Sequence, residues 1–346
     1  MRRLVLTLSV VLAPSLAHAQ AFTPLSSLEG VLAPSASAAT RESNLQAGAA
    51  DSGLGRRAAM AGNVDDADVG NKWLLRVESA RGMGAADRAE YFAAKCGCYR
   101  FLSGSNPRYD ASAPGPGPGS VTDATYTQMF VRGEYALLGR MSVLAEVPFR
   151  QFAPQAFAAG SGSYASTSGL SDVRAGFKFD LMHDSNSQMT LQLLGSAPTG
   201  DAAKSLGTGH WSVEPTMLYT TSLGERAAIE THIGTNFPIN GSRGVPTSNP
   251  VSFAGRVMTF GLAPTFDVYA SGTTRFTPVV EVDGVRFVDG YSTGDDGPAN
   301  GITVVNVHVG ARFSKGRNSV YAGWGKALTN AVVYQNALRV ELRHGL

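Results

Sequence analysis

The chain has 346 residues, of which 16% are charged, 43% are hydrophobic and 40 are glycine. Average globular proteins have about 25% charged residues and about 7% glycine, so this chain is poor in charge and rich in glycine. Its net charge of +2 and its apolar content exclude a disordered chain and a basic nucleic-acid-binding protein. No run of 18 apolar residues follows position 20, which argues against a helical membrane protein. The composition fits an all-β protein, including an outer-membrane barrel.

The first residues, MRRLVLTLSVVLAPSLAHAQ, predict a signal peptide over residues 1–19. Arg2 and Arg3 form a basic start, an apolar run follows, and Ala17 and Ala19 flank His18 in an A-x-A cleavage site. Cleavage near Ala19 would leave 27 basic and 27 acidic side chains. We therefore expect an exported protein whose mature side chains carry no net charge.

Residues 20–69 are rich in alanine, serine and glycine and show little periodicity. Such composition is typical of a linker rather than of a packed domain. We predict a mostly irregular extension here, exposed to the periplasm or plugging a lumen from below, followed by a barrel over residues 70–346.

After residue 70, segments of about ten to fourteen residues alternate apolar and polar side chains, the period of a β-strand with one apolar face. In residues 172–181, Val173, Ala175, Phe177, Phe179 and Leu181 share one face, and polar residues or glycine occupy the other. Twelve such strands are predicted, near residues 70–82, 121–137, 141–153, 169–182, 188–198, 210–222, 226–239, 252–269, 275–288, 302–314, 318–329 and 335–346.

The connections between these strands alternate in length. Those after the even-numbered strands are short (LGR, HDSNSQ, SLGE, SGTT and KGR), and those after the odd-numbered strands are longer. This alternation predicts an up-and-down antiparallel transmembrane β-barrel with short periplasmic turns and long external loops. Because twelve is even, both barrel termini would be periplasmic. The location would be the outer membrane of a Gram-negative bacterium, with outer-membrane lipid and the barrel-insertion machinery as partners.

The apolar face of such a barrel contacts lipid, and the polar face lines the lumen. Ionised residues with lipid-facing parity lie near strand ends: Arg256, Arg286, Lys326 and His344. Aromatic residues of the same parity also lie near strand ends, as in an aromatic girdle: Trp73, Trp211, Tyr219, Phe313 and Trp324.

The predicted lumen carries charges of both signs. The side chains expected to line it are Arg132, Glu134, Glu146, Arg150, Asp172, Arg174, Lys178, Glu214, Glu230, His232, Glu281, Asp283, Arg312, Arg339 and Glu341. They form either a network of ion pairs that satisfies buried charges or a polar path that sets selectivity, and the two interpretations are compatible. Mixed charges argue against a strongly ion-selective pore. A twelve-stranded barrel lies between filled eight-stranded barrels and wide porins, so a passage would be narrow and suited to one small solute.

Six prolines fall inside predicted strands, of which Pro198 and Pro238 mark the external rim. Four lie deeper: Pro148, Pro215, Pro264 and Pro278. Proline removes a ladder donor, so central strands normally exclude it. Two interpretations stay open, a tolerated kink and a locally weakened wall with a lateral gap. Continuous main-chain pairing through all four would exclude the gap.

Two further motifs have candidate chemistry. His210 and Ser212 share a strand face, as the His and Ser of an outer-membrane acyl hydrolase would, but no oxyanion donor accompanies them. Cys96 and Cys98 are the only cysteines, and an oxidising compartment favours a disulfide over free thiols. The aromatic residues around the cysteines either pack the loop on the barrel mouth or form an apolar access site: Tyr91, Phe92, Tyr99 and Phe101.

The stretch GLSDVRAGFKFDLM, the P-T-G-D turn and G-T-G element of SAPTGDAAKSLGTGHW, and the late GWGKALTN resemble a family of outer-membrane barrels. This is the phenol-degradation meta-pathway family, whose members are labelled transporters. The resemblance covers roughly residues 121–346 and implies uptake of aromatic or other hydrophobic compounds, without catalytic residues. The chain departs from usual barrels in ending on Leu346 rather than an aromatic residue.

The leading hypothesis is therefore a porin-like barrel for passive uptake of a small, hydrophobic or aromatic solute. The alternative is a structural or interaction barrel with a closed lumen, and an acyl hydrolase comes third. We predict no enzyme activity, no cofactor, no metal site and no nucleic-acid partner.

Overall fold

The computed structural model describes residues 60–83, 104–105, 121–157, 165–201, 204–239, 254–292, 297–298, 300–330 and 332–346. The predicted signal peptide and most of the extension lie outside these ranges. So do Cys96, Cys98, Tyr91, Phe92, Tyr99 and Phe101. Among the described residues, no helix has the length and apolar character needed to cross a membrane.

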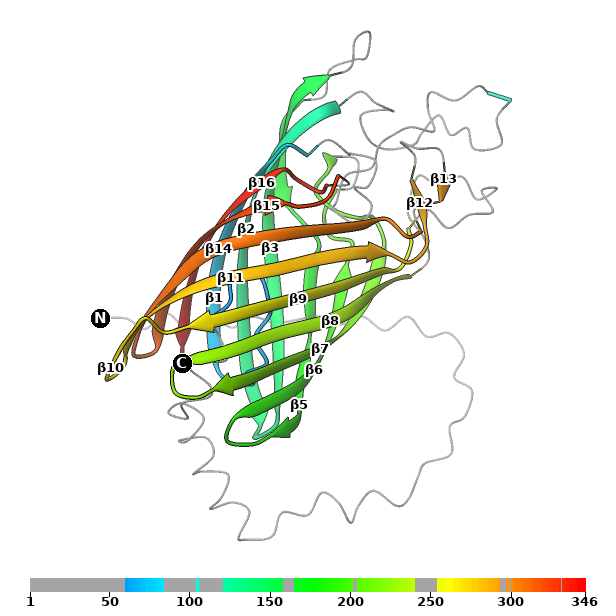
Figure 1. The fold of residues 1–346 in the computed structure, drawn as a ribbon. Coiled ribbons are helices and arrows are strands. Elements are labelled where there is room, and N and C mark those ends of the chain that lie inside the picture. The colour runs from blue at the N-terminus through cyan, green and yellow to red at the C-terminus, as the bar shows by residue number, and fades with distance from the viewer. Residues whose placement is uncertain are drawn as a thin grey trace, which may run out of the picture. The chain divides into compact units, whose positions relative to one another are not determined.

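Within the described residues, twelve antiparallel strands form a closed wall (Figure 1). They are β1 (Lys72–Arg81), β2 (Val121–Leu138), β3 (Met141–Phe157), β5 (Val173–His183), β6 (Ser187–Ala197), β7 (Trp211–Leu223), β8 (Ala227–Ile239), β9 (Val257–Phe266), β11 (Thr274–Phe287), β14 (Thr303–Lys315), β15 (Asn318–Ala327) and β16 (Asn336–Gly345). Each pairs with its neighbours along the chain, and β1 pairs with β16 to close the barrel. The all-β, up-and-down fold class is confirmed.

Four shorter strands add to this wall: β4 (Thr167–Leu170), β10 (Tyr269–Ser271), β12 (Tyr291–Ser292) and β13 (Gly297–Pro298). β4 continues the pairing of β3 beyond β5, and β10 pairs with β11 beyond β9. β12 and β13 form a separate hairpin.

Five tight turns lie at one end of the barrel, which we call the turn end, and the opposite end is the loop end. The turns follow β2, β5, β7, β10 and β14. Gly224, Gly272 and Gly316 have φ angles of 75°, 53° and 58°, left-handed values that favour glycine in such turns. Lys72 pairs with Gly345, so the barrel begins and ends at the turn end, as the even strand number predicts.

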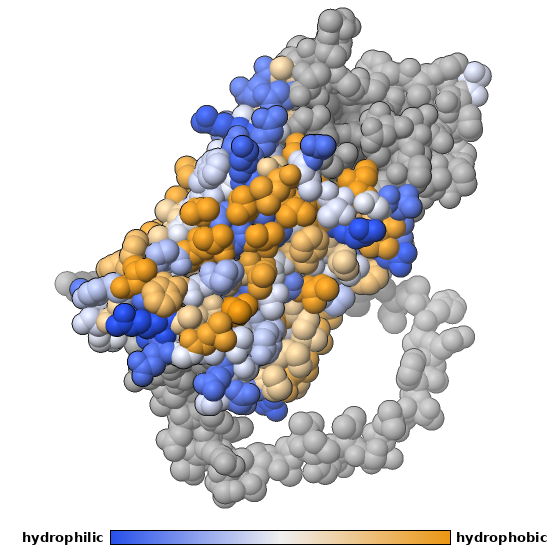
Figure 2. All heavy atoms as spheres, in the orientation of Figure 1, coloured by the Kyte–Doolittle hydropathy of each residue, from blue (hydrophilic) through white to orange (hydrophobic). Residues whose placement is uncertain are grey.

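Along the strands, buried polar side chains alternate with exposed apolar ones. On β14, Asn306, His308 and Arg312 are buried, whereas Val309 and Phe313 are exposed. Figure 2 shows apolar side chains across the middle of the barrel face and hydrophilic ones toward its two ends. The predicted girdle residues Trp73, Trp211, Phe313 and Trp324 are exposed, and Tyr219 is half-buried. The wall is therefore apolar outside and polar inside.

Two predicted strands differ from the structure. The predicted strand 252–269 is wrong at its start, since β9 begins only at Val257. A Cβ on Gly255 would lie 1.9 Å from the carbonyl oxygen of Asp289, and the Arg256 amide donates to Asp289 Oδ1 at 2.5 Å. This close packing takes residues 254–256 out of the ladder. The predicted strand 169–182 is interrupted at Ser171 and Asp172, where the register against β3 shifts by one residue.

Each of the four prolines is paired with one neighbouring strand, and main-chain pairing is interrupted only on its other side. Pro148 lies opposite the interruption between β4 and β5, and its carbonyl accepts from the Ser171 amide at 2.9 Å. The β7–β8 pairing skips Pro215, and the β9–β11 pairing skips Pro264 and stops before Pro278. The condition that would have excluded a lateral gap, continuous pairing through all four prolines, is therefore not met, and a lateral route through the wall stays a prediction.

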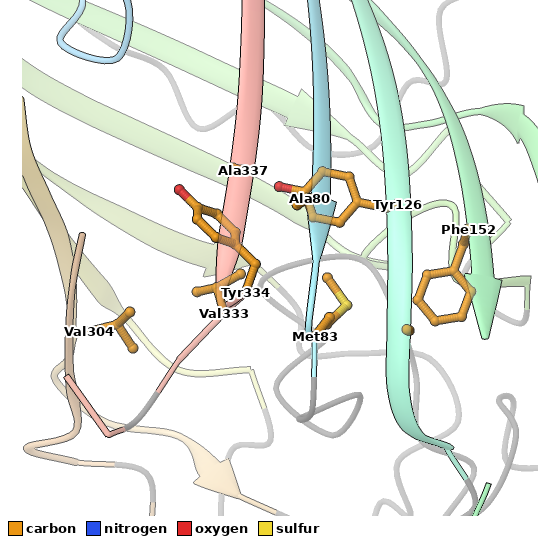
Figure 3. Packing of buried hydrophobic residues seen from close by; sticks show 9 residues of the cluster. Ala80, Met83, Tyr126, Phe152, Val304, Val333, Tyr334 and Ala337 are labelled. Carbon is orange, nitrogen blue, oxygen red and sulfur yellow. The ribbon is translucent and has the colours of Figure 1, made fainter. Parts of the chain in front are cut away.

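An apolar cluster lies at the loop end, where β14, β16, β1, β2 and β3 meet. It contains Ala80, Met83, Ala124, Tyr126, Phe152, Val304, Val333, Tyr334 and Ala337. Figure 3 shows Val333 and Tyr334, from the connection before β16, between Val304 on one side and Met83 and Tyr126 on the other. This cluster covers one side of the lumen at the loop end.

Candidate functional site

Residues 60–70, directly before β1, lie inside the barrel and are called the lumen segment. Its side chains Ala61, Val64 and Ala67 are 2%, 3% and 0% exposed. Its contacts come from β1, β2, β5, β6, β8, β11, β14 and β16, near the turn end. The segment therefore occupies the turn half of the lumen.

Two carboxylates bind five successive backbone amides of the lumen segment. Glu230 Oε1 accepts from the amides of residues 60 and 61 at 2.9 and 3.1 Å. Glu281 accepts from the amides of residues 62, 63 and 64 at 2.9, 2.6 and 3.0 Å. The hydroxyl of Tyr321 donates to Glu281 at 2.9 Å and orients the carboxylate.

Two arginines bind the carbonyls of the same stretch. Arg312 Nε donates to the Met60 carbonyl at 2.9 Å, and its Nη2 donates to the Ala61 carbonyl at 2.8 Å. Arg339 Nη1 donates to the Gly62 carbonyl at 2.6 Å. The barrel therefore recognises the main chain of this stretch, rather than its side chains, with charged groups of both signs.

The acidic residues of the segment bind lysine and arginine of the wall. Asp66 Oδ1 lies 3.2 Å from Lys178 Nζ and 2.6 Å from Lys72 Nζ, and Asp66 Oδ2 lies 3.2 Å from Arg343 Nη1. Burial would raise the pKa of Asp66, but the charges of Lys178, Lys72 and Arg343 outweigh it and hold that pKa well below its usual range. The lumen segment therefore binds inside the barrel with the Asp66 carboxylate ionised.

Little space is left between the lumen segment and the wall formed by β1, β2 and β16. The cavity there, bordered by Ala61, Asp66, Arg76, Glu134 and Arg343, has a volume of about 20 Å³. A cavity of this size holds one water molecule. On this side of the described structure, the segment closes the turn half to solutes.

The loop half contains a larger cavity, which we call the chamber, with a volume of about 260 Å³. It is lined by Gln128, Phe130, Pro148, Arg150, Ser171, Asp172, Arg174, Ser196, Thr208, His210, Ser212, Glu214 and Asn236. The lining comes from β2, β3, β5, β6, β7 and β8 and from the connections beside them. The chamber therefore follows one side of the barrel wall.

Asp172 fixes the connection between β6 and β7 at the edge of the chamber. Its carboxylate accepts from the amides of Gly200 and Thr208 at 2.9 and 2.7 Å, and from Thr208 Oγ1 at 2.7 Å. A Cβ on Gly207 would lie 2.4 Å from Asp172 Oδ1, so this approach requires glycine. The P-T-G-D and G-T-G elements thus have a structural role, holding this connection on the carboxylate.

Most of the predicted lumen residues lie in one of these two regions. Nine lie around the lumen segment, namely Arg132, Glu134, Lys178, Glu230, His232, Glu281, Arg312, Arg339 and Glu341. Four line the chamber, namely Arg150, Asp172, Arg174 and Glu214. The other two lie elsewhere: Glu146 is 3.5 Å from Arg76 and 3.7 Å from Arg174, and Asp283 is 2.5 Å from His308.

Aromatic residues of the lumen were missed at the sequence level. Tyr126 and Phe130 have the same parity as Gln128 and Arg132 on β2, and Phe152 has that of Arg150 on β3. The Arg76 guanidinium lies 4.2 Å from the centre of the Phe130 ring, and that of Arg150 lies 5.2 Å from the Tyr126 ring. Their parity, which they share with lumen-facing charged residues of the same strands, was visible in the sequence and could have identified them as lumen residues.

His210 and Ser212, the hydrolase candidates, both line the chamber. Asn236 Nδ2 donates to Ser212 Oγ at 3.2 Å. A nucleophilic serine needs a base to accept its proton, and an amide donor does not supply one. This contact makes Ser212 part of a polar lining.

Comparison with known proteins identifies the family. The chain belongs to the family described as "Putative MetA-pathway of phenol degradation", whose model matches residues 121–335. The match includes the chamber and most of the wall but not β1, β16 or the lumen segment. The predicted family resemblance is therefore confirmed. The search of curated proteins finds no match.

Solved structures support the fold. An outer membrane channel from Pseudomonas putida F1 has a TM-score of 0.54 and 15% identity, covering 83% of this chain and 99% of that chain. The β domain of the Bordetella autotransporter BrkA has a TM-score of 0.45 and 12% identity, with coverages of 81% and 100%. LpxR from Salmonella typhimurium has a TM-score of 0.40 and 10% identity, with coverages of 80% and 100%. Of these three, the first has a TM-score above 0.5, and at 15% identity it shows the outer-membrane barrel fold.

Proposed function

We propose that the protein is an outer-membrane channel for passive uptake of small aromatic or other hydrophobic compounds. The observation that carries the proposal is the chamber of about 260 Å³ inside a closed wall whose outer face is apolar. Family membership supports the solute class, and the aromatic side chains of the lumen provide surfaces for such a solute. The turn end would face the periplasm once the signal peptide is cleaved near Ala19, and lipid would surround the wall.

The lumen segment acts in this proposal as a plug that closes the channel in the state described. It fills the turn half of the lumen, and its contacts are hydrogen bonds and ion pairs that water can replace. Passage of a solute to the periplasm therefore requires the lumen segment to leave its binding position inside the barrel. The channel has no separate energy source and works by diffusion.

Conductance in planar bilayers and liposome swelling would test the proposal. The comparison is between the processed full chain and a variant lacking residues 60–68, both checked for heat-modifiable mobility as evidence of a folded barrel. We expect low flux of phenol-sized solutes through the full chain and clearly higher flux through the variant. If neither protein conducts ions or passes any solute, the channel proposal is wrong.

A second candidate is a structural or interaction barrel with a permanently closed lumen. The small cavity of about 20 Å³ beside the seated segment favours it. Unchanged permeability after removal of residues 60–68 would support this candidate over a plugged channel. A hydrolase ranks last because of the Asn236 contact to Ser212, and lipase activity retained in Ser212→Ala would remove it.

A further inference from the structure

We propose that the chamber is a binding site for a small aromatic acid, an arene carrying a carboxylate. This proposal rests on the proposed function, because it names the solute that would pause on its way through the channel. It follows from an apolar surface and two guanidinium groups that face the same cavity.

Phe130 and Pro148 form the apolar surface. They are directly paired across β2 and β3, so their side chains lie next to each other on the lumen face. Both line the chamber. The Arg76 guanidinium, 4.2 Å from the ring centre, stacks on Phe130 and fixes its orientation. A solute ring packed on Phe130 and Pro148 would gain the offset or edge-to-face contacts that aromatic groups prefer.

Arg150 and Arg174 supply the positive charge. They come from β3 and β5, and both line the chamber. The side chain of Arg174 remains 31% exposed even though its Nη2 contacts Glu214 at 3.0 Å. A guanidinium has five N–H donors in a planar fork, which suits a carboxylate. An acid whose ring lies on Phe130 would direct its charge toward these arginines.

The chamber's own carboxylates are directed at protein donors. Asp172 accepts three hydrogen bonds from Gly200 and Thr208. Glu214 Oε2 accepts from Arg174 at 3.0 Å and lies 3.5 Å from Asn236 Nδ2. The arginines have protein partners too, since Arg174 contacts Glu214 and Glu146 and Arg150 Nε donates to Gln128 Oε1 at 3.0 Å. A guanidinium with five N–H donors can share them with an incoming carboxylate, so the chamber favours an anion over a cation. Its volume of about 260 Å³ is below the usual range for drug-sized ligands, about 300–1,000 Å³, so a single ring fits best.

Calorimetric titration of the purified full chain in detergent would test the site. The probes are benzoate, benzyl alcohol, butyrate and benzylammonium at pH 7. We expect benzoate to bind about tenfold more tightly than benzyl alcohol or butyrate, the difference expected for one charged hydrogen-bonded contact or one ring surface. We expect no binding of benzylammonium. Equal affinity for benzoate and benzyl alcohol, or tighter binding of benzylammonium, would overturn the proposal.

Two variants locate the site, and a third serves as a control. Arg174→Gln should weaken benzoate about tenfold and leave benzyl alcohol unchanged, whereas Phe130→Ala should weaken both. Arg256→Gln, at an exposed arginine paired with Asp289 outside the chamber, should change neither. Benzoate affinity unchanged in Arg174→Gln would show that the site lies elsewhere. Should Arg174→Gln fail to fold, Arg150→Gln is the replacement, with the same expectation.

Binding and transport fail separately. Benzoate that binds the chamber without any solute flux through the variant lacking residues 60–68 would contradict the channel and leave the site standing. Solute flux through that variant, with no benzoate binding to either protein, would contradict the site and leave the channel standing.

Discussion

The two halves of the lumen are lined by the same kinds of side chain and yet differ in content. In the turn half, Glu230, Glu281, Arg312 and Arg339 surround a stretch of main chain and leave a cavity of only about 20 Å³ on the side of β1, β2 and β16. In the loop half, a similar mixture of charges encloses a chamber of about 260 Å³. Within the described residues, the difference comes from a short segment that occupies one half of the lumen, and not from the strand number, which both halves share. On the proposed function this segment closes the channel, through contacts that individual substitutions can weaken.

The largest effect is expected from Gly62→Val. A Cβ at position 62 would lie 2.2 Å from Tyr321 Cε1, inside the ring's contact surface. Overpacking of this kind costs about 3 kcal/mol, which would shift the segment toward its released state by more than about a hundredfold. Single-channel recording would detect this shift as a rise in open time.

Gly70→Ala is a control at a second glycine of the lumen segment, one that has room for a Cβ. The nearest atom to a Cβ at Gly70 is Asp68 Oδ2 at 3.4 Å, an ordinary contact. Its conductance should equal that of the wild type. If Gly62→Val also behaves like the wild type, the two halves do not differ in the way described.

Glu281→Gln should open the channel less strongly. The amide keeps the size of the carboxylate but loses the charge that three backbone amides and Tyr321 face. A loss of about 2 kcal/mol is expected, or about a 30-fold shift toward release. Glu214→Gln, in the chamber, should leave the closed state unchanged, and conductance measured for both variants would compare the halves directly.

Acidification should release the segment because of Asp66. Its pKa in the seated segment is well below its usual range, whereas a released, solvated Asp has a pKa of about 3.9. Below about pH 4 the released state therefore binds more protons, so the stability of seating is present above that pH and lost as pH falls further. We expect open time to rise about tenfold between pH 6 and pH 3.

Ionisation of Asp68 is expected to have the opposite effect on release of the segment from that of Asp66. Burial raises its pKa, so its ionisation favours release rather than seating. Asp68→Asn should therefore keep the opening at low pH, whereas Asp66→Asn should already be more open at pH 6 and show a smaller acid response, since only Asp65, paired with Arg132 at 3.3 Å, would remain in the segment to give one. An Asp66→Asn channel that still opens only on acidification would show that another group controls release.

The smallest effect is expected from Tyr321→Phe. This change removes the hydroxyl that donates to Glu281 at 2.9 Å and leaves the backbone contacts in place. The cost should be about 1 kcal/mol, or about a fivefold shift in open time. No shift would mean that the tyrosine does not orient the carboxylate.

The wall could be predicted from the sequence because its two environments impose a period of two. Charges such as Lys178 and Arg312 fall on the buried face, and Val309 and Phe313 fall on the exposed one. Most of the short turns could be predicted equally well from their glycines, although the turn between β5 and β6 has none. The break at Ser171 was missed, although the exposed Leu170 has the opposite parity to the apolar residues Val173 and Phe177. The register shift itself depends on contacts with β3.

The wall residues that bind the lumen segment show no comparable pattern in the sequence. A plug was predicted as one role of residues 20–69, but nothing in the sequence indicated which residues enter the lumen. The reason is physical, since Glu230, Glu281 and Arg312 bind backbone atoms, which every residue possesses. Gly62 is the exception, because the Tyr321 ring leaves no room for a side chain there.

The pairing of β1 with β16 determines when in assembly the lumen segment can seat. Its contacts span 170 residues from Met60 to Glu230 and 277 residues from Gly62 to Arg339. Before the seam closes, each contact requires closure of a loop of that length, which is entropically unfavourable. Once Lys72 pairs with Gly345, every residue of the segment lies within twelve residues of that tether. We therefore expect closure of the seam to come first, so that each molecule passes through an unplugged barrel on its way to the plugged one.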